Sequence, residues 1–185
     1  MFKFLFSCFY FFLPAYFNNM IPSLTSSLGV LNFFDKPVDG GRQFGGKPLL
    51  GSHKTWRFIL GGIVGLAVVF IQRWLYINCP VAQSVSLINY QESNILTFGL
   101  SITLGASFGD MFFAFIKRRL NLKSGAKFMP WDQTNYVLGS AFFLYLFYGL
   151  KIDLMVWITL AVFTFIFHST STQVGFMLGL SRSKW

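Results

Sequence analysis

The stretch ILTFGLSITLGASFGDMFFAFI, residues 95–116, decides the fold because it is long and apolar enough to span a membrane without help from its flanks. A helix needs about 20 such residues to cross a bilayer. Near its end stands one acid, Asp110, seven residues before the basic run 117–119. A carboxylate inside hydrocarbon costs about 2.5–3.5 kcal/mol, so chance placement is disfavoured. The stretch therefore predicts a membrane helix whose acid has a function.

The composition of the 185-residue chain is that of a membrane protein. Hydrophobic residues make up 54% of it, 25 residues are Phe and only 11% are charged, which is far from the average of soluble domains. Four further apolar runs are candidate spans, at residues 2–17, 58–71, 136–150 and 154–167. We predict an all-α fold: one domain over residues 1–185, a polytopic membrane helix bundle of about five transmembrane helices.

The shorter runs reach the length of a membrane span only together with their flanking residues. Run 58–71 reaches spanning length if Trp56 and Trp74 lie at the interfaces while Arg57 and Arg73 extend outward, and the last run extends through His168. Only residues 151–153 separate the fourth run from the fifth. This break indicates a tight hairpin, and the alternative is one long helix.

The first run resembles a signal peptide in its early Lys3 and apolar core, but it lacks a small-residue cleavage site. We interpret it as a retained anchor rather than a cleaved signal. Pro14 and Pro22 predict a kink, or a helix that continues at an angle toward Leu31. The two cysteines, Cys8 and Cys79, form no CxxC pattern, so neither a disulfide nor a thiolate metal site is indicated.

The basic residues predict the orientation, because Lys and Arg accumulate in short cytoplasmic loops. Segment 31–57 holds five of the fifteen, segment 117–132 holds five, and Arg182 and Lys184 lie in the tail. The other three are Lys3, Arg73 and Lys151. Five spans with the N-terminus outside and the C-terminus in the cytoplasm satisfy this division, in an integral multi-pass protein of the cell membrane.

Acids occur on the same predicted side, since Asp35, Asp39, Asp110 and Asp132 all fall in or near the basic segments. A charge pattern that only set the orientation of the helices in the membrane would need only Lys and Arg. The net charge of +9 also favours contact with the anionic headgroups of membrane lipids. We expect no nucleic-acid partner, because the positive charge is spread over membrane loops and accompanied by acids.

Helical spacing indicates that Asp110 faces protein. Residues seven apart lie nearly on one face, so Asp110, Ala114 and Lys117 form one stripe. Ser101, Gly105 and Gly109 repeat every four residues, a pattern that permits close packing of helices. The alternative is that Asp110 has only a structural role, paired with a neighbouring helix or extended toward the interface. Gly61 and Gly65 form a second small face, for which packing is the better interpretation.

The loop KPVDGGRQFGGKPLLGSHKTWR, residues 36–57, combines five glycines with basic side chains. Glycines leave backbone N–H groups accessible and lysines supply point charges, so such a loop can hold phosphates, particularly if Ser52 caps a helix starting near Lys54. It is not a Walker A loop, because Gly46-Lys47 is followed by Pro48. A flexible loop is the alternative. Basic loops and carboxylates without a nucleophilic Ser, Cys or His suggest metal-assisted chemistry on a phosphorylated substrate.

Three blocks, in order, resemble the motifs of the CDP-archaeol synthase family, membrane cytidylyltransferases related to phosphatidate cytidylyltransferases. They are PVDGGRQFGGKPLLGSHKTWR (37–57), GDMFFAFIKRRLNLKSGAKFMPWDQTNYVLG (109–139) and GFMLGLSRSKW (175–185), and the similarity runs from about Leu13 to Trp185. The resemblance implies transfer of a cytidylyl group from CTP to a lipid phosphate, archaetidic-acid-like or phosphatidate-like, with Mg²⁺ required and pyrophosphate released. Both kinds of lipid chain present only apolar surface, so the sequence does not distinguish them, and it carries no sign of oligomeric state.

The resemblance also suggests roles for individual residues. Asp110 and Asp132 are the expected Mg²⁺ ligands and, with Lys117, the catalytic residues. The expected substrate-binding residues are Asp39, Gly40, Gly41, Ser52, Lys54, Thr55, Arg57, Arg118, Arg119, Lys123, Gln133 and Asn135. The sequence departs from the family pattern once, because Asn135 stands where the run DQxD would place a second acid. Asn135 offers a neutral oxygen, so a second metal is held more weakly or another acid such as Asp39 compensates.

Three alternatives remain open. Asp39-Gly40-Gly41-Arg42 resembles the start of the CDP-alcohol phosphotransferase motif, but the later run of paired acids is missing. A lipid or anion transporter would have polar groups near the membrane midplane and inverted repeats, whereas these acids gather at one side. A non-catalytic membrane scaffold leaves the position of Asp110 unexplained.

Overall fold

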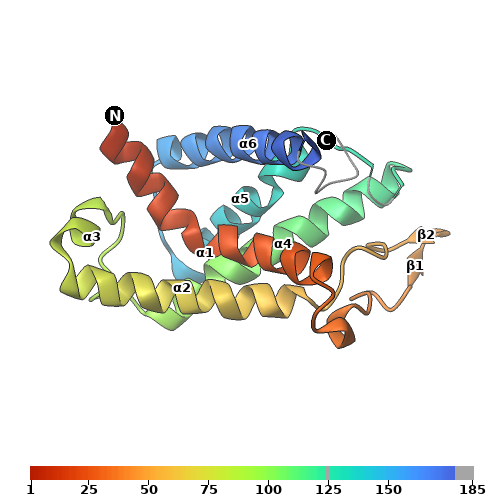
Figure 1. Cartoon of the computed structure of the whole chain (residues 1–185), viewed down its shortest axis with the longest axis horizontal. Helices are drawn as coiled ribbons and strands as arrows, with labels where there is room; N and C mark the ends of the chain where they lie inside the picture. The colour runs from red at the N-terminus through yellow and green to blue at the C-terminus, as the bar shows by residue number, and fades with distance from the viewer. Residues whose placement is uncertain (124–125, 178–185) are drawn as a thin grey trace.

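The computed structural model describes residues 1–123 and 126–177, and most of this part of the chain is helical (Figure 1). The helices are α1 (Phe2–Ser27), α2 (Phe58–Asn78), α3 (Pro80–Val85), α4 (Ile95–Arg119), α5 (Trp131–Phe143) and α6 (Leu154–Met177). A 3-10 turn, η1 (Asn32–Phe34), follows α1, and a π-helical turn, η2 (Leu144–Tyr148), follows α5. The antiparallel strands β1 (Gln43–Phe44) and β2 (Lys47–Pro48) form a small hairpin in the glycine-rich loop.

The prediction of an all-α membrane bundle is confirmed. Among the described residues, α1, α2 and α4 are long and apolar enough to cross a membrane, and α6 has a shorter apolar stretch over Leu154–Thr170. Together α5 and η2 form the fourth long segment of the bundle. Gly149, in the left-handed region at φ 69°, ends η2, and α6 begins at Leu154. The fourth and fifth runs are therefore two helices, as the hairpin prediction stated.

The first apolar run forms one helix that continues to Ser27, as the predicted continuation toward Leu31 stated, and buries Phe11 and Phe12 in the core. Figure 1 shows its ribbon changing direction midway. Pro14 has no N–H, so the carbonyl of Tyr10 lacks its helical partner. The Gln72 side chain of α2 donates to that carbonyl, and the Tyr10 hydroxyl donates to the Gln72 carbonyl at 3.3 Å.

Close packing of glycines sets the two tightest helix pairs, as the spacing of small residues predicts. A Cβ on Gly61 of α2 would lie 2.2 Å from the Asn18 carbonyl oxygen of α1. In the second pair, a Cβ on Gly109 of α4 would lie 2.2 Å from the Asn135 carbonyl oxygen of α5, and one on Gly139 would lie 2.1 Å from the Gly105 carbonyl oxygen. The backbones of α4 and α5 are thus in direct contact beside Asp110.

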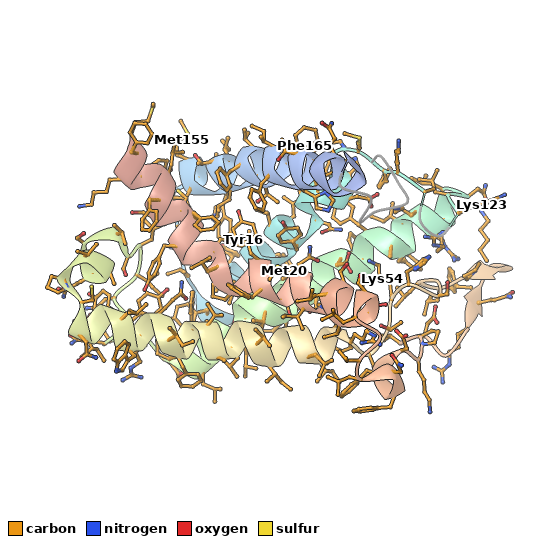
Figure 2. All side chains as sticks on the ribbon, in the orientation of Figure 1. Tyr16, Met20, Lys54, Lys123, Met155 and Phe165 are labelled. Carbon is orange, nitrogen blue, oxygen red and sulfur yellow. The ribbon has the colours of Figure 1, made fainter. Side chains whose placement is uncertain are left out.

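The two basic loops meet at one end of the bundle. The Lys47 ammonium donates to the Arg119 carbonyl at 3.2 Å, and the Arg118 guanidinium donates to the Leu50 carbonyl at 3.2 Å. Figure 2 shows Lys54 and Lys123 at this end and Met155, at the start of α6, at the opposite end. The fold therefore brings the glycine-rich loop onto the C-terminal end of α4.

Candidate functional site

Asp110 lies in the centre of the charged end and faces protein, as its helical position predicts. The Lys54 ammonium contacts both carboxylate oxygens of Asp110, at 2.7 and 2.6 Å. The Asn135 amide donates to Asp110 Oδ1 at 3.3 Å. The side chain of Asp110 is 30% exposed, so this ion pair is reachable from solvent. Three elements meet here: α4 supplies the acid, the glycine-rich loop the lysine, and α5 the amide.

Asp132 forms a second pair of the same kind. The Lys117 ammonium contacts its two oxygens at 2.9 and 2.8 Å, and the Phe128 N–H donates to Asp132 Oδ2 at 2.9 Å. Asp132 lies in the first turn of α5, where the positive end of the helix dipole favours a carboxylate. Each carboxylate of the site is thus neutralised by one lysine.

A cavity of about 320 Å³ connects the two pairs. We call it the carboxylate cavity. Asp110, Ala114 and Lys117 all line it, which confirms that they share one face of α4. Its remaining predicted lining residues are Lys54, Arg118, Asp132, Gln133 and Asn135. Seven of the predicted site residues are therefore brought together around one space.

Asp39 organises the glycine-rich loop instead of facing the carboxylate cavity. Its carboxylate accepts the N–H groups of Leu50 at 2.8 Å, Gly41 at 2.9 Å and Gly51 at 3.1 Å. Burial alone would raise the pKa of Asp39, but these three N–H groups outweigh it and hold the pKa below its usual value. Gly40 and Gly41 take positive φ angles of 58° and 78° in this turn. Both carboxylate oxygens of Asp39 accept N–H groups of the loop, and Asp39 does not line the carboxylate cavity, so it is poorly placed to replace a missing acid at 135.

A second cavity, of about 520 Å³, is bordered by this loop, and we call it the loop cavity. Asp39, Gly41 and Ser52 line it from the loop, and Arg118 and Lys123 line it from the end of α4 and the segment that follows. Arg118 also lines the carboxylate cavity, so this residue borders both spaces.

Arg57 departs from the prediction that it extends outward. It is only 1% exposed, and its guanidinium donates to Asp35 at 2.7 Å, the Val30 carbonyl at 2.7 Å and Asn32 Oδ1 at 3.0 Å. The hydrogen bond from Arg57 lowers the pKa of Asp35. These acceptors lie in the segment after α1, so Arg57 fastens that segment to the start of α2.

Arg119 also makes contacts that hold the fold together. Its guanidinium donates to the carbonyls of Phe44, Lys47 and Pro48, and its Cζ lies 5.0 Å from the centre of the Phe115 ring. These contacts hold the β1–β2 hairpin against α4. Among the other predicted residues, Thr55 pairs with Pro37 in an isolated bridge and lines a third cavity together with Ser52.

The sequence reasoning missed several lining residues. His53 and His168 line both the carboxylate cavity and the third cavity, and Ser169 and Lys127 line the former. His168 lies near the end of an apolar run, as Asp110 does, and that position was the signal available for it. The third motif block extends beyond Met177, so most of it lies outside the described residues.

The site offers oxygen donors that suit a magnesium ion. Among the described residues, no three His, Cys, Asp or Glu side chains are grouped as a complete metal site. Two buried amide oxygens in the carboxylate cavity, Asn135 Oδ1 and Gln133 Oε1, make no hydrogen bond. Mg²⁺ prefers a few protein oxygens together with waters and substrate phosphates rather than an all-protein cage. Asp110, Asp132 and the Asn135 amide oxygen are a fitting set.

These features define a polytopic helical membrane protein with a charged cavity at the end where its basic loops meet. A family model described as CarS-like CDP-archaeol synthase matches residues 1–185. The chain belongs to the CDP-archaeol synthase family.

Two relatives from different genera match over almost their whole length. The CDP-archaeol synthase of Methanosarcina acetivorans is 30% identical, covering 94% of this chain and 99% of its own. That of Thermococcus gammatolerans is 33% identical, covering 94% and 92% respectively. A solved structure described as "Structural insight into an intramembrane enzyme for archaeal membrane lipids biosynthesis" is similar with a TM-score of 0.68 at 26% identity, covering 88% of this chain and 90% of that one. The transporter and scaffold alternatives are not favoured.

Proposed function

We propose that this chain transfers a cytidylyl group from CTP to a membrane lipid phosphate, forming a CDP-lipid and pyrophosphate. The observation that carries the proposal is the pair of lysine-neutralised carboxylates, Asp110 with Lys54 and Asp132 with Lys117, in one cavity of a family member. Because the named relatives are CDP-archaeol synthases, an isoprenoid ether lipid phosphate is the first substrate to test and a diacyl phosphatidate the second.

The chemistry needs no protein nucleophile or base. A phosphate monoester has a second pKa near 6, so the lipid phosphate is already a dianion at neutral pH. One of its oxygens attacks the α-phosphorus of CTP, the bond from that phosphorus to the bridging oxygen breaks, and the electron pair leaves with pyrophosphate. The protein must hold two anions that repel each other in line. Lysines and arginines around the carboxylate cavity serve this purpose.

The same site would use Mg²⁺, held by Asp110 and Asp132 with the amide oxygen of Asn135 as a neutral ligand. When bound, the ion neutralises phosphate charge beyond what the lysines supply. Lys54 and Lys117 neutralise the carboxylates in the present structure and have the flexible side chains to turn toward phosphates. We further propose that the loop end of the bundle faces the cytoplasm, where CTP is made.

The test is incubation of the purified protein with radiolabelled CTP, Mg²⁺ and each lipid phosphate, followed by detection of a labelled CDP-lipid. Asp110→Asn and Asp132→Asn keep the side-chain shape and remove the charge, so we expect normal folding and near-complete loss of product. Glu92→Gln, an exposed acid in the α3–α4 loop, is the matched control and should retain activity. Absence of product with every lipid phosphate would overturn the proposal, and activity in Asp110→Asn would make that acid structural.

A further inference from the structure

We propose that the turn after α1 is an interfacial anchor, whose apolar side chains lie in the boundary between lipid headgroups and acyl chains at the loop end of the bundle. Its exposed apolar side chains, which we call the apolar turn, are Leu28, Val30, Leu31 and Phe33. Figure 1 shows this segment, in orange, at the outer edge of the bundle beside the start of α2. The inference goes beyond the proposed function, because it holds whether or not the chain forms a CDP-lipid.

The segment has a charged group inside and apolar groups outside. Phe33 is 67% exposed and Leu28 is 65% exposed, whereas Arg57, which the segment contacts, is 1% exposed. In water this arrangement is unfavourable, because a buried charge loses its hydration and an exposed apolar side chain gains nothing from burial. Next to hydrocarbon the same arrangement is favourable. The distribution of side chains therefore indicates that the apolar turn faces lipid.

Polar contacts hold the segment in this orientation. The Arg57 guanidinium donates to the Val30 carbonyl and to the Asp35 carboxylate, each at 2.7 Å. The Trp56 N–H donates to the Lys36 carbonyl at 3.1 Å, which ties the following residues to the start of α2 as well. The apolar side chains cannot turn inward without breaking these hydrogen bonds. Their exposure is thus built into the fold.

The length of α2 places the apolar turn at the edge of the bilayer. The helix has 21 residues. At 1.5 Å per residue it is about 31 Å long, close to the ~30 Å thickness of the hydrocarbon core. Its first residue, Phe58, then lies at one boundary of the hydrocarbon, with Arg57 just outside. Because Arg57 contacts the segment directly, the apolar turn lies at the same boundary. Trp56 is 42% exposed at this level, where Trp side chains are enriched in membrane proteins.

A lipid surface fits the apolar turn better than a protein partner does. The exposed apolar surface continues onto α1, where Leu24 is 45% exposed one helical turn before Leu28. It is therefore continuous with the surface of a membrane-spanning helix. Lys36, which is exposed, follows the apolar turn. An ammonium group next to apolar side chains matches anionic headgroups above acyl chains.

The anchor acts on the loop that carries Lys54. Past the apolar turn, the Val38 N–H donates to the Lys54 carbonyl at 2.8 Å. Arg57, which holds the apolar turn, lies only three residues after Lys54. Insertion of the apolar turn therefore keeps this loop at the level of the lipid headgroups.

The first experiment measures depth with a nitroxide on Phe33→Cys in lipid nanodiscs. The chain also carries Cys79→Ser, because Cys79 is partly exposed and the other cysteine, Cys8, is buried. Collisions of the nitroxide with oxygen, which concentrates in hydrocarbon, are compared with collisions with a water-soluble nickel chelate. Gln43→Cys on β1 and Phe70→Cys in the middle of α2, both exposed positions, are the matched references for water and hydrocarbon.

We expect the oxygen-to-nickel ratio at position 33 to lie about threefold above that at position 43 and below that at position 70. A ratio equal to that at position 43 would place the segment in water and overturn the proposal.

The second experiment adds a label on Leu28→Cys and uses nickel carried on lipid headgroups. We expect this nickel to relax the labels at positions 28 and 33 more strongly than those at positions 43 and 70, because only the first two lie at headgroup depth. Low collision rates at 28 and 33 with oxygen, soluble nickel and headgroup nickel alike would show that a second copy of the chain covers the segment, and would overturn the proposal. Neither measurement needs turnover, so their outcome is separate from that of the test for CDP-lipid formation.

Discussion

Gly109→Ala tests whether the contact between α4 and α5 sets the geometry of the site. A Cβ on Gly109 would lie 2.2 Å from the Asn135 carbonyl oxygen, whereas ordinary contacts begin at 3.4 Å. The obstacle is backbone, so the two helices must separate by about 1 Å. Asp110 follows Gly109 directly, and its partner Asn135 carries the obstructing carbonyl. The displacement therefore acts on the acid and its amide partner at once.

The expected result is a large loss of activity with little loss of stability. A misplacement of the reacting groups by about 1 Å lowers the rate of a reaction on the order of 100-fold. Overpacking costs about 1–3 kcal/mol, and replacing a helical glycine by alanine returns about 1 kcal/mol. The measurements are the kcat of CDP-lipid formation and the thermal midpoint in detergent. Gly62→Ala is the control, because its Cβ would meet nothing closer than 3.8 Å. Wild-type turnover in Gly109→Ala, or equal impairment of Gly62→Ala, would refute the reasoning.

Four other changes test the remaining assignments. Lys54→Ala should raise the CTP concentration needed for half-maximal rate without affecting membrane insertion, and unchanged kinetics would make the loop a simple linker. Asn135→Asp puts a second carboxylate beside Asp110, so Mg²⁺ should raise its thermal midpoint more than that of the wild type; an equal response would place this side chain away from the metal. The pKa of Asp39 is lowered in the folded protein, so its stabilisation of the loop is complete above about pH 4 and is lost as the pH falls through the folded pKa. Limited proteolysis of the loop should increase in that acidic range, and Asp39→Asn should remove this pH dependence. A protease site inserted at Gly45 should resist external protease in sealed cells, and cleavage there would reverse the predicted orientation.

Local rules predicted much of the fold. The run 95–116 was long enough to define α4, and four-residue spacing of small residues identified the face that packs on α5. Helical spacing also placed Asp110, Ala114 and Lys117 on one wall. These inferences succeeded because each depends on residues within one helix, where the geometry follows directly from separation in sequence.

Contacts between segments that lie far apart in the sequence could not be predicted from spacing within one helix. The pair Lys54–Asp110 joins a loop to a helix 56 positions away, so only the assembled bundle defines it. Arg57 was predicted to extend outward because basic residues at helix ends usually do, but the segment after α1 supplies Asp35 and carbonyl acceptors that bury it. His168 was overlooked as part of a long apolar run, although it lies beside the site across from α4 and α5.

The hydrogen bonds between α1 and α2 have a consequence for biogenesis. Because Pro14 leaves the Tyr10 carbonyl without a helical partner, α1 alone in lipid would expose an unsatisfied backbone group, at a cost of several kcal/mol. Alone in lipid, α2 would likewise expose the polar amide of Gln72. The hydrogen bond from the Gln72 side-chain N–H to the Tyr10 carbonyl therefore satisfies one polar group on each helix. Each of the two helices alone is therefore disfavoured in the bilayer, whereas the hairpin of α1 and α2 is stable there. We expect the insertion machinery to release the two helices into the lipid together.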